Sequence, residues 1–250
     1  MKQGIFTITE NRKLTPTTWL MRMTGDVSGI RAPGQFINIK LSGRFLRRPI
    51  SMCDARRDGI TIIYKVLGHG TEDMTCLMPG DELDVLTGLG NGYDLSDAGE
   101  KPLLIGGGVG IPPLYLLARC LTNADTTVIL GFNNAEEVYY VDEFEKLGAR
   151  VIVATADGSR GVRGFVTDAF RTLVTQGETF THFYTCGPEP MLRAVYERVY
   201  EKAGISGQMS FEERMGCGFG ACMGCSIRTR DGYKRICKDG PVLRTEEILW

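Results

Sequence analysis

The sequence predicts an all-β domain followed by an α/β domain, with a short cysteine-rich segment at the end. Three observations support this prediction. Short strand-like runs separated by turn residues fill positions 1–98, strand-like and helical runs alternate over 99–208, and regular periodicity fades over 209–250. Strands that alternate with helices imply a parallel, doubly wound sheet in the second domain.

The composition is that of an ordinary globular protein. Of the 250 residues, 43% are hydrophobic and 24% are charged, which excludes disorder as the main state. Lysine plus arginine (29) nearly balances aspartate plus glutamate (30), which argues against nucleic acid or an anionic membrane as the main partner. The longest uncharged apolar run, 102–118, is too short and too broken to span a bilayer, and the N-terminus lacks the apolar core of a secretion signal. We therefore expect a cytoplasmic protein.

The first domain is predicted to be a small antiparallel barrel or sandwich. Apolar and polar residues alternate in two of its runs, which is typical of half-buried strands, and turn residues separate the runs at short intervals. The expected strands are 17–23, 35–41 and 59–66, with turns at 32–34, 57–59 and 79–81 and one short helix at 71–77.

The second domain is predicted to alternate strands with helices. Each strand-like run is short and apolar, and each helical run places its apolar residues three and four positions apart. The expected strands are 102–105, 126–130, 151–154 and 181–186, and the expected helices are 114–121, 141–147, 166–174 and 191–203.

The most specific motif is a run of cysteines in the last segment. Its spacing is Cys217-x4-Cys222-x2-Cys225-x11-Cys237, and its first part matches the run that ligates a plant-type [2Fe–2S] cluster. Glycines between the cysteines allow a tight loop to aim backbone N–H groups at the sulfurs. A structural zinc site is the alternative, but such sites usually pair two short Cys knuckles, whereas here one loop supplies three cysteines.

A glycine turn follows the first strand of the α/β domain. It contains Gly106, Gly107, Gly108 and Gly110 and leads into a helix, so that backbone N–H groups could hold a dinucleotide pyrophosphate. A merely tight connection is the alternative. The next strand is followed by Gly131-Phe132-Asn133 rather than by an acidic residue, which leaves the choice between NAD and NADP open.

A second turn, Cys186-Gly187-Pro188, follows the last strand of this domain. Ligands of open α/β sheets bind at the carboxyl ends of the strands, so Cys186 is a candidate neighbour of the nicotinamide. A buried cysteine without a role is the alternative.

Two short motifs in the β domain suit a flavin diphosphate. Arg47-Arg48-Pro49-Ile50-Ser51 offers a guanidinium and a hydroxyl, and Gly68-His69-Gly70-Thr71 offers a glycine turn before a short helix. A solvated basic turn and an ordinary loop are the alternatives.

Taken in order along the chain, these motifs resemble the ferredoxin–NADP reductase superfamily. In that superfamily an Arg-x-x-Ser motif holds the flavin and a Gly-Thr turn holds its diphosphate. The resemblance therefore implies FAD contacts at Arg48, Pro49, Ile50, Ser51, Gly70 and Thr71, and places Ile63, Tyr64 and Lys65 on a strand along the flavin.

The cysteine segment narrows the resemblance. Residues 212–222 and 232–242 look like the electron-transfer subunits of B-type, NAD-dependent dihydroorotate dehydrogenases. The resemblance implies an electron relay in pyrimidine (UMP) synthesis. A separate FMN-containing subunit would oxidise dihydroorotate, and its electrons would pass through the [2Fe–2S] cluster and FAD to NAD. It also implies a heterotetramer of two subunits of each kind.

Three other interpretations remain at this point. A self-contained NADH-dependent reductase usually carries a complete ferredoxin domain, for which 209–250 is too short. The small subunit of a ferredoxin-linked transhydrogenase is closer, although we expect its cluster loop to differ. A non-enzymatic zinc-binding module would explain the cysteines but not the two nucleotide-type domains.

The cluster loop contains four apolar residues, Met215, Phe219, Ala221 and Met223. They suggest a surface for the partner, or else an inward fold onto the flavin domain.

Overall fold

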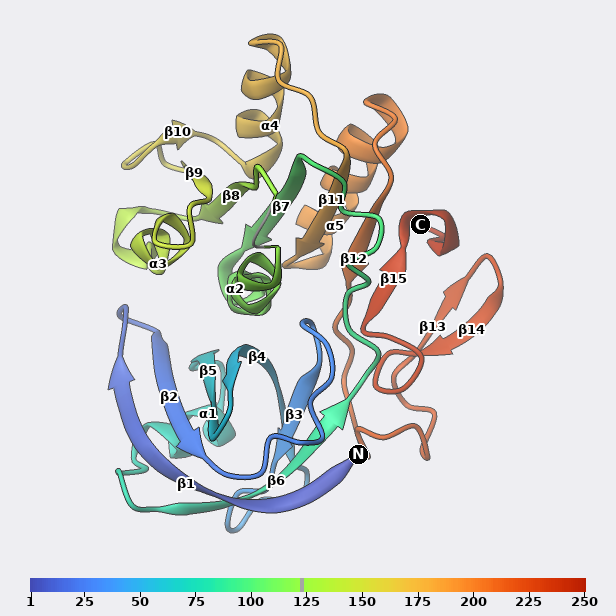
Figure 1. Cartoon of the computed structure of the whole chain (residues 1–250). Helices are drawn as coiled ribbons and strands as arrows, with labels where there is room; N and C mark the ends of the chain where they lie inside the picture. Colours follow the sequence, from blue (N-terminus) through green and yellow to red (C-terminus); the bar gives the residue numbers. More distant parts are fainter. Residues whose placement is uncertain (122–123) are drawn as a thin grey trace.

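The computed structural model describes residues 1–121 and 124–250. Strands β1 to β6 close an antiparallel barrel in the order β1-β2-β5-β4-β3-β6, shown in blue to green at the bottom of Figure 1. Of the barrel and the sandwich that the sequence allows, the barrel is the one formed. Its elements are β1 (Lys2–Lys13), β2 (Thr18–Thr24), β3 (Phe36–Ile39), β4 (Arg48–Arg56), β5 (Gly59–Lys65), α1 (His69–Thr75) and β6 (Glu82–Leu89).

Alternation along the strands decides which side chains fill the barrel. In β3, Ile37 and Ile39 enter the barrel core, whereas Phe36 belongs to a different apolar cluster outside the barrel. In β5, Tyr64 enters the same core while Ile63 packs toward the second domain. Successive residues of a strand point to opposite faces, so the outer face of the barrel is free to contact other parts of the chain.

The second domain is built on a sheet of order β10-β9-β8-β7-β11-β12-β15. Neighbouring strands from β10 to β12 are parallel, as the alternation of strands and helices predicts. Its elements are β7 (Pro102–Gly107), α2 (Ile111–Cys120), β8 (Thr127–Phe132), α3 (Val141–Glu145), β9 (Arg150–Thr155), β10 (Val162–Arg163), α4 (Val166–Thr175), β11 (His182–Cys186), α5 (Glu189–Val195), β12 (Gly207–Ser210) and β15 (Val242–Arg244).

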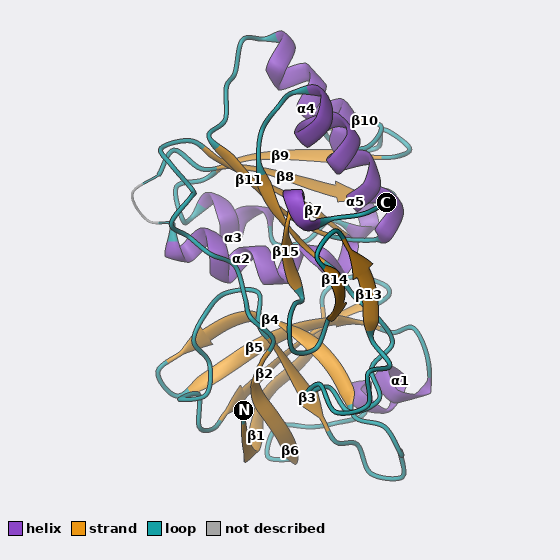
Figure 2. Ribbon diagram, turned by 90° about the vertical axis from the view of Figure 1, so that its right-hand side faces the viewer, coloured by secondary structure: helices purple, strands orange, loops and turns teal. Residues whose placement is uncertain are grey.

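Helices cover both faces of this sheet (Figure 2). Helices α2 and α3 contribute to one apolar cluster together with Ile63 of the barrel, and α4 and α5 contribute to a separate cluster on the other face. From β7, the chain adds β8, β9 and β10 on one side and β11 and β12 on the other, so the strand order reverses between β7 and β11. In open α/β sheets such a switch point, at the carboxyl ends of the strands, is where ligands bind.

Two features of the second domain differ from the sequence prediction. The helix expected at 191–203 is α5 followed by a π-helical stretch, Tyr196–Lys202. The sheet is not wholly parallel, because β15 of the C-terminal segment pairs antiparallel with β12. Within residues 1–121 and 124–250, no helix combines the length and apolarity that crossing a membrane requires.

The C-terminal segment lies against both domains (Figure 1). It contains a hairpin of β13 (Ser226–Thr229) and β14 (Gly232–Arg235), followed by β15. Its small apolar cluster joins Cys225, Ile236 and Cys237 to Phe36 and Leu89 of the barrel region. A segment this short cannot enclose a core alone, so it completes its core with residues of the barrel.

Candidate functional site

Motifs from all three parts of the chain meet around one pocket. The pocket contains about 730 Å³ of empty space, part of which is open to solvent. It is lined by Phe36, Pro49, Ser51, Val109, Gly110, Cys186, Gly187, Pro188, Ser210, Phe211, Glu212, Glu213, Met215 and Pro241. The expected flavin motif, the expected nicotinamide turn and the start of the cluster loop therefore share one cavity.

The structure distinguishes the two arginines of the flavin motif. Arg47 donates to both carboxylate oxygens of Asp84, at 3.0 and 2.9 Å, and its charge is therefore neutralised within the barrel. Arg48 instead lies against Gly70, where an added Cβ would stand 2.0 Å from Arg48 Nε. Arg48 and the first turn of α1, which begins at His69, are thus brought together from distant parts of the chain. The Arg48 guanidinium pairs with no carboxylate among the described residues, so it is available to a diphosphate.

Thr71 shapes the turn in which it lies. Its hydroxyl donates to the carbonyl of Gly68 at 3.0 Å and accepts from the N–H groups of Leu67 and Gly68, at 3.0 and 3.3 Å. These bonds use the hydrogen-bonding capacity of the hydroxyl. Any contact of Thr71 with a flavin diphosphate would therefore come from its backbone.

Residues 63–65 of β5 divide between core and interface. Tyr64 is buried in the barrel, where its hydroxyl donates to Asn11 Oδ1 at 3.1 Å, and burial raises the pKa of this phenol. Only the backbone of Tyr64 can therefore border a flavin. Lys65 Nζ lies 3.8 Å from Glu137 Oε1 of the second domain, and this ion pair joins the two domains beside the expected flavin strand.

The glycines after β7 have different roles. A Cβ on Gly106 would approach Ile111 and Leu114 of α2 at 2.9 and 3.0 Å, so this glycine permits close packing of the helix on the strand. A Cβ on Gly110 would stand 2.2 Å from the carbonyl oxygen of Cys186, and one on Gly107 would stand 2.4 Å from Met191 Sδ. Gly108 has open surroundings and a φ of 53°. The glycine turn and the Cys-Gly-Pro turn are thus packed against one another.

Cys186 ends β11 beside the pocket and is paired in register with Gly106 and Ser210. Burial raises the pKa of its thiol to about 12, although the Ser210 side chain lowers it in part. The thiol is therefore neutral at physiological pH. It can shape a nicotinamide site and donate a weak hydrogen bond, but it has little thiolate to act as a nucleophile.

Several pocket residues are absent from the sequence-predicted site. Phe36, Ser210 and Pro241 come from β3, from β12 and from the loop before β15, and only the tertiary fold brings them together. Glu212 also lines the pocket, and burial together with the nearby Glu213 raises the pKa of its carboxyl. Strand β12 reaches this site because it runs parallel to β11 in a register that pairs Ser210 with Cys186.

The four cysteines of the last segment form two pairs. Cys217 and Cys222, here called the outer pair, lie on a loop whose N–H groups point at Cys217 Sγ, from Ala221 at 3.2 Å and from Cys222 at 3.4 Å. Partial burial raises the pKa of Cys217, but hydrogen bonds from the N–H groups of Cys222 and Phe219 lower it by more. The net pKa is about 6. The outer pair therefore includes a sulfur that its own loop stabilises as a thiolate.

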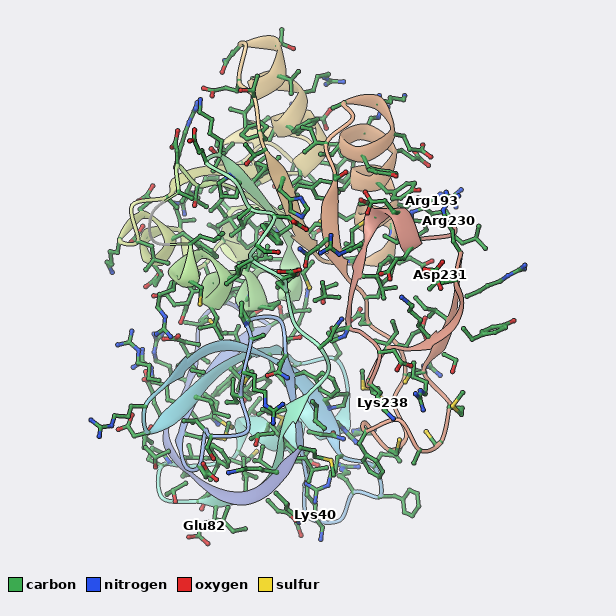
Figure 3. All side chains as sticks on the ribbon, turned by 45° about the vertical axis from the view of Figure 1, so that its right-hand side comes forward. Lys40, Glu82, Arg193, Arg230, Asp231 and Lys238 are labelled. Carbon is green, nitrogen blue, oxygen red and sulfur yellow. The ribbon has the colours of Figure 1, made fainter. Side chains whose placement is uncertain are left out.

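Cys225 and Cys237, here called the inner pair, are each 2% exposed. The N–H of Cys237 donates to Cys225 Sγ at 3.4 Å. Burial, the neighbouring Cys225 and the more distant Cys217 raise the pKa of Cys237 to about 12, so an uncompensated second thiolate is disfavoured there. Lys238 lies near the sulfur-bearing side chains of this segment (Figure 3), with its aliphatic chain packed on Gly220.

This donor set fits an iron–sulfur cluster. Each pair supplies two sulfur ligands, as each iron of a two-iron cluster requires, and backbone N–H groups aimed at the sulfurs are the expected surroundings of such a centre. Among the described residues, no group of three or more His, Cys, Asp or Glu side chains is placed to hold a single metal ion. The inner pair and Phe36 belong to one apolar cluster, and Phe36 also lines the pocket, so this cluster extends from the cysteines to the flavin motif.

Comparison with known proteins gives two family matches. Residues 212–249 match the "Iron-sulfur cluster binding domain of dihydroorotate dehydrogenase B", and residues 104–197 match the "Oxidoreductase NAD-binding domain". The first match covers the whole cysteine run, and the second covers the glycine turn and the Cys-Gly-Pro turn.

Solved structures show the same architecture. A chain of the NADH-dependent reduced ferredoxin-NADP oxidoreductase, described for flavin-based electron bifurcation, is 30% identical, with a TM-score of 0.89 over 98% of this chain and 90% of that chain. A ferredoxin NADP+ reductase from Neisseria gonorrhoeae with bound FAD and NADP is 17% identical, with a TM-score of 0.70 over 86% of this chain and 94% of that chain, and shows the fold alone. These likenesses confirm the predicted fold class.

Curated relatives match from end to end. The "Dihydroorotate dehydrogenase B (NAD(+)), electron transfer subunit" of Fusobacterium nucleatum subsp. nucleatum is 42% identical over 99% of both chains. The protein of the same description from Bacillus caldolyticus is 41% identical over 97% of both chains. Identity at this level over the full length, together with the cysteine and glycine motifs, confirms the resemblance seen in the sequence. The chain belongs to the family of electron transfer subunits of dihydroorotate dehydrogenase B.

Proposed function

We propose that this chain carries electrons from a dihydroorotate-oxidising, FMN-containing subunit through a [2Fe–2S] cluster and FAD to NAD+. The observation that carries the proposal is the shared pocket. The flavin motif, the Cys-Gly-Pro turn and the start of the cluster loop line one cavity, and Phe36 at its edge belongs to the same apolar cluster as the inner cysteine pair. An electron relay needs its redox centres close together, and a shared pocket meets this need.

The proposed cofactor contacts follow the motifs. The cluster ligands are Cys217, Cys222, Cys225 and Cys237. FAD is held by Arg48, Pro49, Ile50, Ser51, Gly70 and Thr71, and by the strand Ile63, Tyr64 and Lys65. NAD is held by Gly106, Gly107, Gly108, Gly110, Cys186, Gly187 and Pro188. The proposal divides the chain into a flavin domain over 1–98, an NAD domain over 99–208 and a cluster segment over 209–250.

The residues of the chain bind and orient the cofactors and exclude water from the pocket. When bound, the cluster carries single electrons and the flavin converts them to the pair that nicotinamide accepts as hydride. Arg48 neutralises diphosphate charge, and the contact between Gly110 and Cys186 keeps the nicotinamide turn close to β7. The neutral Cys186 thiol and the Ser210 side chain border the place where flavin and nicotinamide would meet.

The outer pair belongs, in this proposal, to the surface that meets the partner. Phe219 is 45% exposed and Met223 is 54% exposed, whereas Met215 is packed in the apolar cluster beside the barrel. The loop thus folds inward at its start and stays exposed at its tip. An assembly of two subunits of each kind and a cytoplasmic location are the remaining parts of the proposal.

The test uses the purified chain together with the dihydroorotate-oxidising subunit. The chain alone is expected to contain FAD, iron and sulfide, and NADH is expected to bleach its flavin absorbance under anaerobic conditions. With the partner present, dihydroorotate is expected to drive reduction of NAD+. A chain that binds zinc without flavin, or a complex that reduces NAD+ without any need for this chain, contradicts the proposal.

A second function has one observation in its favour. The bifurcating oxidoreductase chain is 30% identical to this chain with a TM-score of 0.89, which favours, as the second candidate, a small subunit that links NADH to ferredoxin-dependent reduction of NADP. The higher identity to the dihydroorotate dehydrogenase B subunits, 38 to 42%, favours the first proposal. Co-purification decides between them, because the two functions require different partners.

A further inference from the structure

The outer face of β3 lies between the barrel and the cluster segment. Ile37 and Ile39 point into the barrel core, so Phe36 and Asn38 share the opposite face. Phe36 belongs to the same apolar cluster as the inner cysteine pair. Asn38 is a polar residue on this face, and it is 1% exposed.

The Asn38 side chain contacts the loop of the outer pair. Its Nδ2–H group donates to the main-chain carbonyl of Cys217, with 3.4 Å between the heavy atoms. Its Nδ2 also stands 2.3 Å from where a Cβ on Gly218 would lie, and Gly218 has a φ of 78°. A side chain at position 218 would strike this amide and would also strain the backbone. The loop therefore approaches the barrel closely at Asn38.

The backbone of Asn38 is held from both sides. Asn38 pairs with Pro49 of β4 and with Leu86 of β6, and its carbonyl accepts from Arg47 Nη1 at 3.2 Å. Arg47 is in turn paired with Asp84. The position of the amide is thus set by the same strand that runs beside Pro49 of the flavin motif.

The other end of the amide is buried and unpaired among the residues that the structure describes. None of them donates a hydrogen bond to Asn38 Oδ1. A buried amide oxygen without a donor destabilises the fold, so a polar group retained here calls for a reason other than barrel stability.

We propose that Asn38 is a positioning residue that fastens the cluster loop to the flavin barrel and holds the outer cysteine pair at a set distance from the flavin pocket. The inference rests on the proposed cluster site. Asn38 is not a ligand, and it acts through the main chain of Cys217 and Gly218. On the same face, Phe36 is part of the apolar cluster that includes the inner pair, so one short strand borders both halves of the cluster site.

The expected consequence is specific to the cluster. The N–H groups that point at Cys217 Sγ belong to the loop that Asn38 holds, so a shift of this loop changes the hydrogen bonds to that sulfur. Hydrogen bonds to cluster sulfurs set the reduction potential, and loss of such outer contacts typically lowers metal affinity or activity 10- to 100-fold.

The experiment compares Asn38→Leu and Asn38→Asp with the parent chain, each purified with its flavin. Leucine keeps the volume but removes the amide, and aspartate keeps the shape but replaces the donor by an acceptor facing the Cys217 carbonyl. Both variants are expected to lose the cluster to a chelator about 10-fold faster than the parent. Their reduced-cluster electron paramagnetic spectra and cluster potentials are expected to shift, with aspartate showing the larger change. Flavin content and the bleaching of flavin by NADH are expected to stay unchanged.

Thr87→Val is the matched control. Thr87 is another barrel residue whose buried hydroxyl has no hydrogen-bond partner in the described part of the chain, and it lies against Gly29. Its replacement is expected to leave the cluster spectrum and the chelator half-life unaltered, because general loosening of the barrel is not the cause of the Asn38 effect.

Two results overturn the inference. Either both Asn38 variants show the parent's spectrum, potential and half-life, or Thr87→Val changes the cluster as much as they do. If one variant fails to fold, as loss of flavin reveals, the other variant decides. Failure of the proposed function is distinct, because a parent chain without iron and sulfide contradicts the cluster site itself.

Discussion

The outer and inner cysteine pairs contain the same residue type but have opposite surroundings. The inner pair is 2% exposed at each cysteine and belongs to an apolar cluster with Phe36, whereas Cys222 of the outer pair is exposed. An electron relay needs such asymmetry, because a centre must be reachable from the partner on one side and close to the flavin on the other. The environment of the cysteines therefore distinguishes a solvent-facing side of the cluster site from a side packed on the barrel, which their spacing does not.

The largest expected effect tests the inner pair. Cys225→Ser is expected to abolish the [2Fe–2S] electron paramagnetic signal, because serine replaces a buried ligand that the cluster cannot exchange for water. Flavin reduction by NADH is expected to persist. Cys76→Ser, at an exposed cysteine of the flavin domain, serves as the control and is expected to change nothing. A normal cluster spectrum in Cys225→Ser would remove Cys225 from the ligand set.

The next effect tests the surface around the outer pair. Phe219→Glu is expected to keep flavin and NADH-driven dye reduction but to lose assembly with the dihydroorotate-oxidising subunit in gel filtration. Burial of an unpaired carboxylate at an interface costs several kcal/mol. Val174→Glu, a change at an equally exposed apolar residue of α4, is expected to assemble normally. Assembly of Phe219→Glu at the parent's affinity contradicts the contact surface.

A smaller effect tests the flavin side of the comparison. Arg48→Ala removes a charge-assisted hydrogen bond, worth about 1.5–3 kcal/mol, and is expected to weaken flavin retention about 10- to 150-fold. The cluster spectrum is expected to remain, because Arg48 lies against Gly70 rather than against the cysteines. Arg57→Ala, at an exposed arginine of the same domain, is the control. Flavin titration measures the difference, and equal affinities for both variants would place the diphosphate elsewhere.

The smallest expected effect is on the pH dependence of folding stability, and it tests Glu212, which lines the pocket just before the cluster loop. The pKa of Glu212 is raised by burial and by Glu213, so the folded chain binds this proton more tightly than the unfolded chain. Stability is then lost as pH rises from the unfolded pKa through the folded pKa. Glu212→Gln is expected to remove this dependence, which amounts to less than about 0.5 kcal/mol for a partly exposed group. Urea unfolding of both proteins across mildly acidic pH measures it, and identical pH profiles contradict it.

The sequence by itself determined the kinds of element and the kinds of chemistry. Alternation in 17–23 and 35–41 predicts the strands β2 and β3, because successive residues of a strand point to opposite faces. The cysteine spacing predicts an iron–sulfur site, because one loop supplies three cysteines and the fourth follows a short distance along the chain. The glycine turn after β7 and the Cys-Gly-Pro turn after β11 are equally local signals. Each depends on neighbouring residues alone.

Only the tertiary structure decided which of these local features meet. The closure of the barrel, the antiparallel addition of β15 to β12, and the pairing of Cys186 with Ser210 depend on contacts between residues far apart in the chain. Local sequence cannot show that Arg47 is neutralised by Asp84 while Arg48 reaches Gly70, or that Asn38 touches the loop of Cys217. The physical reason is that residue type and spacing set what a side chain can do, whereas burial and strand register set what it faces.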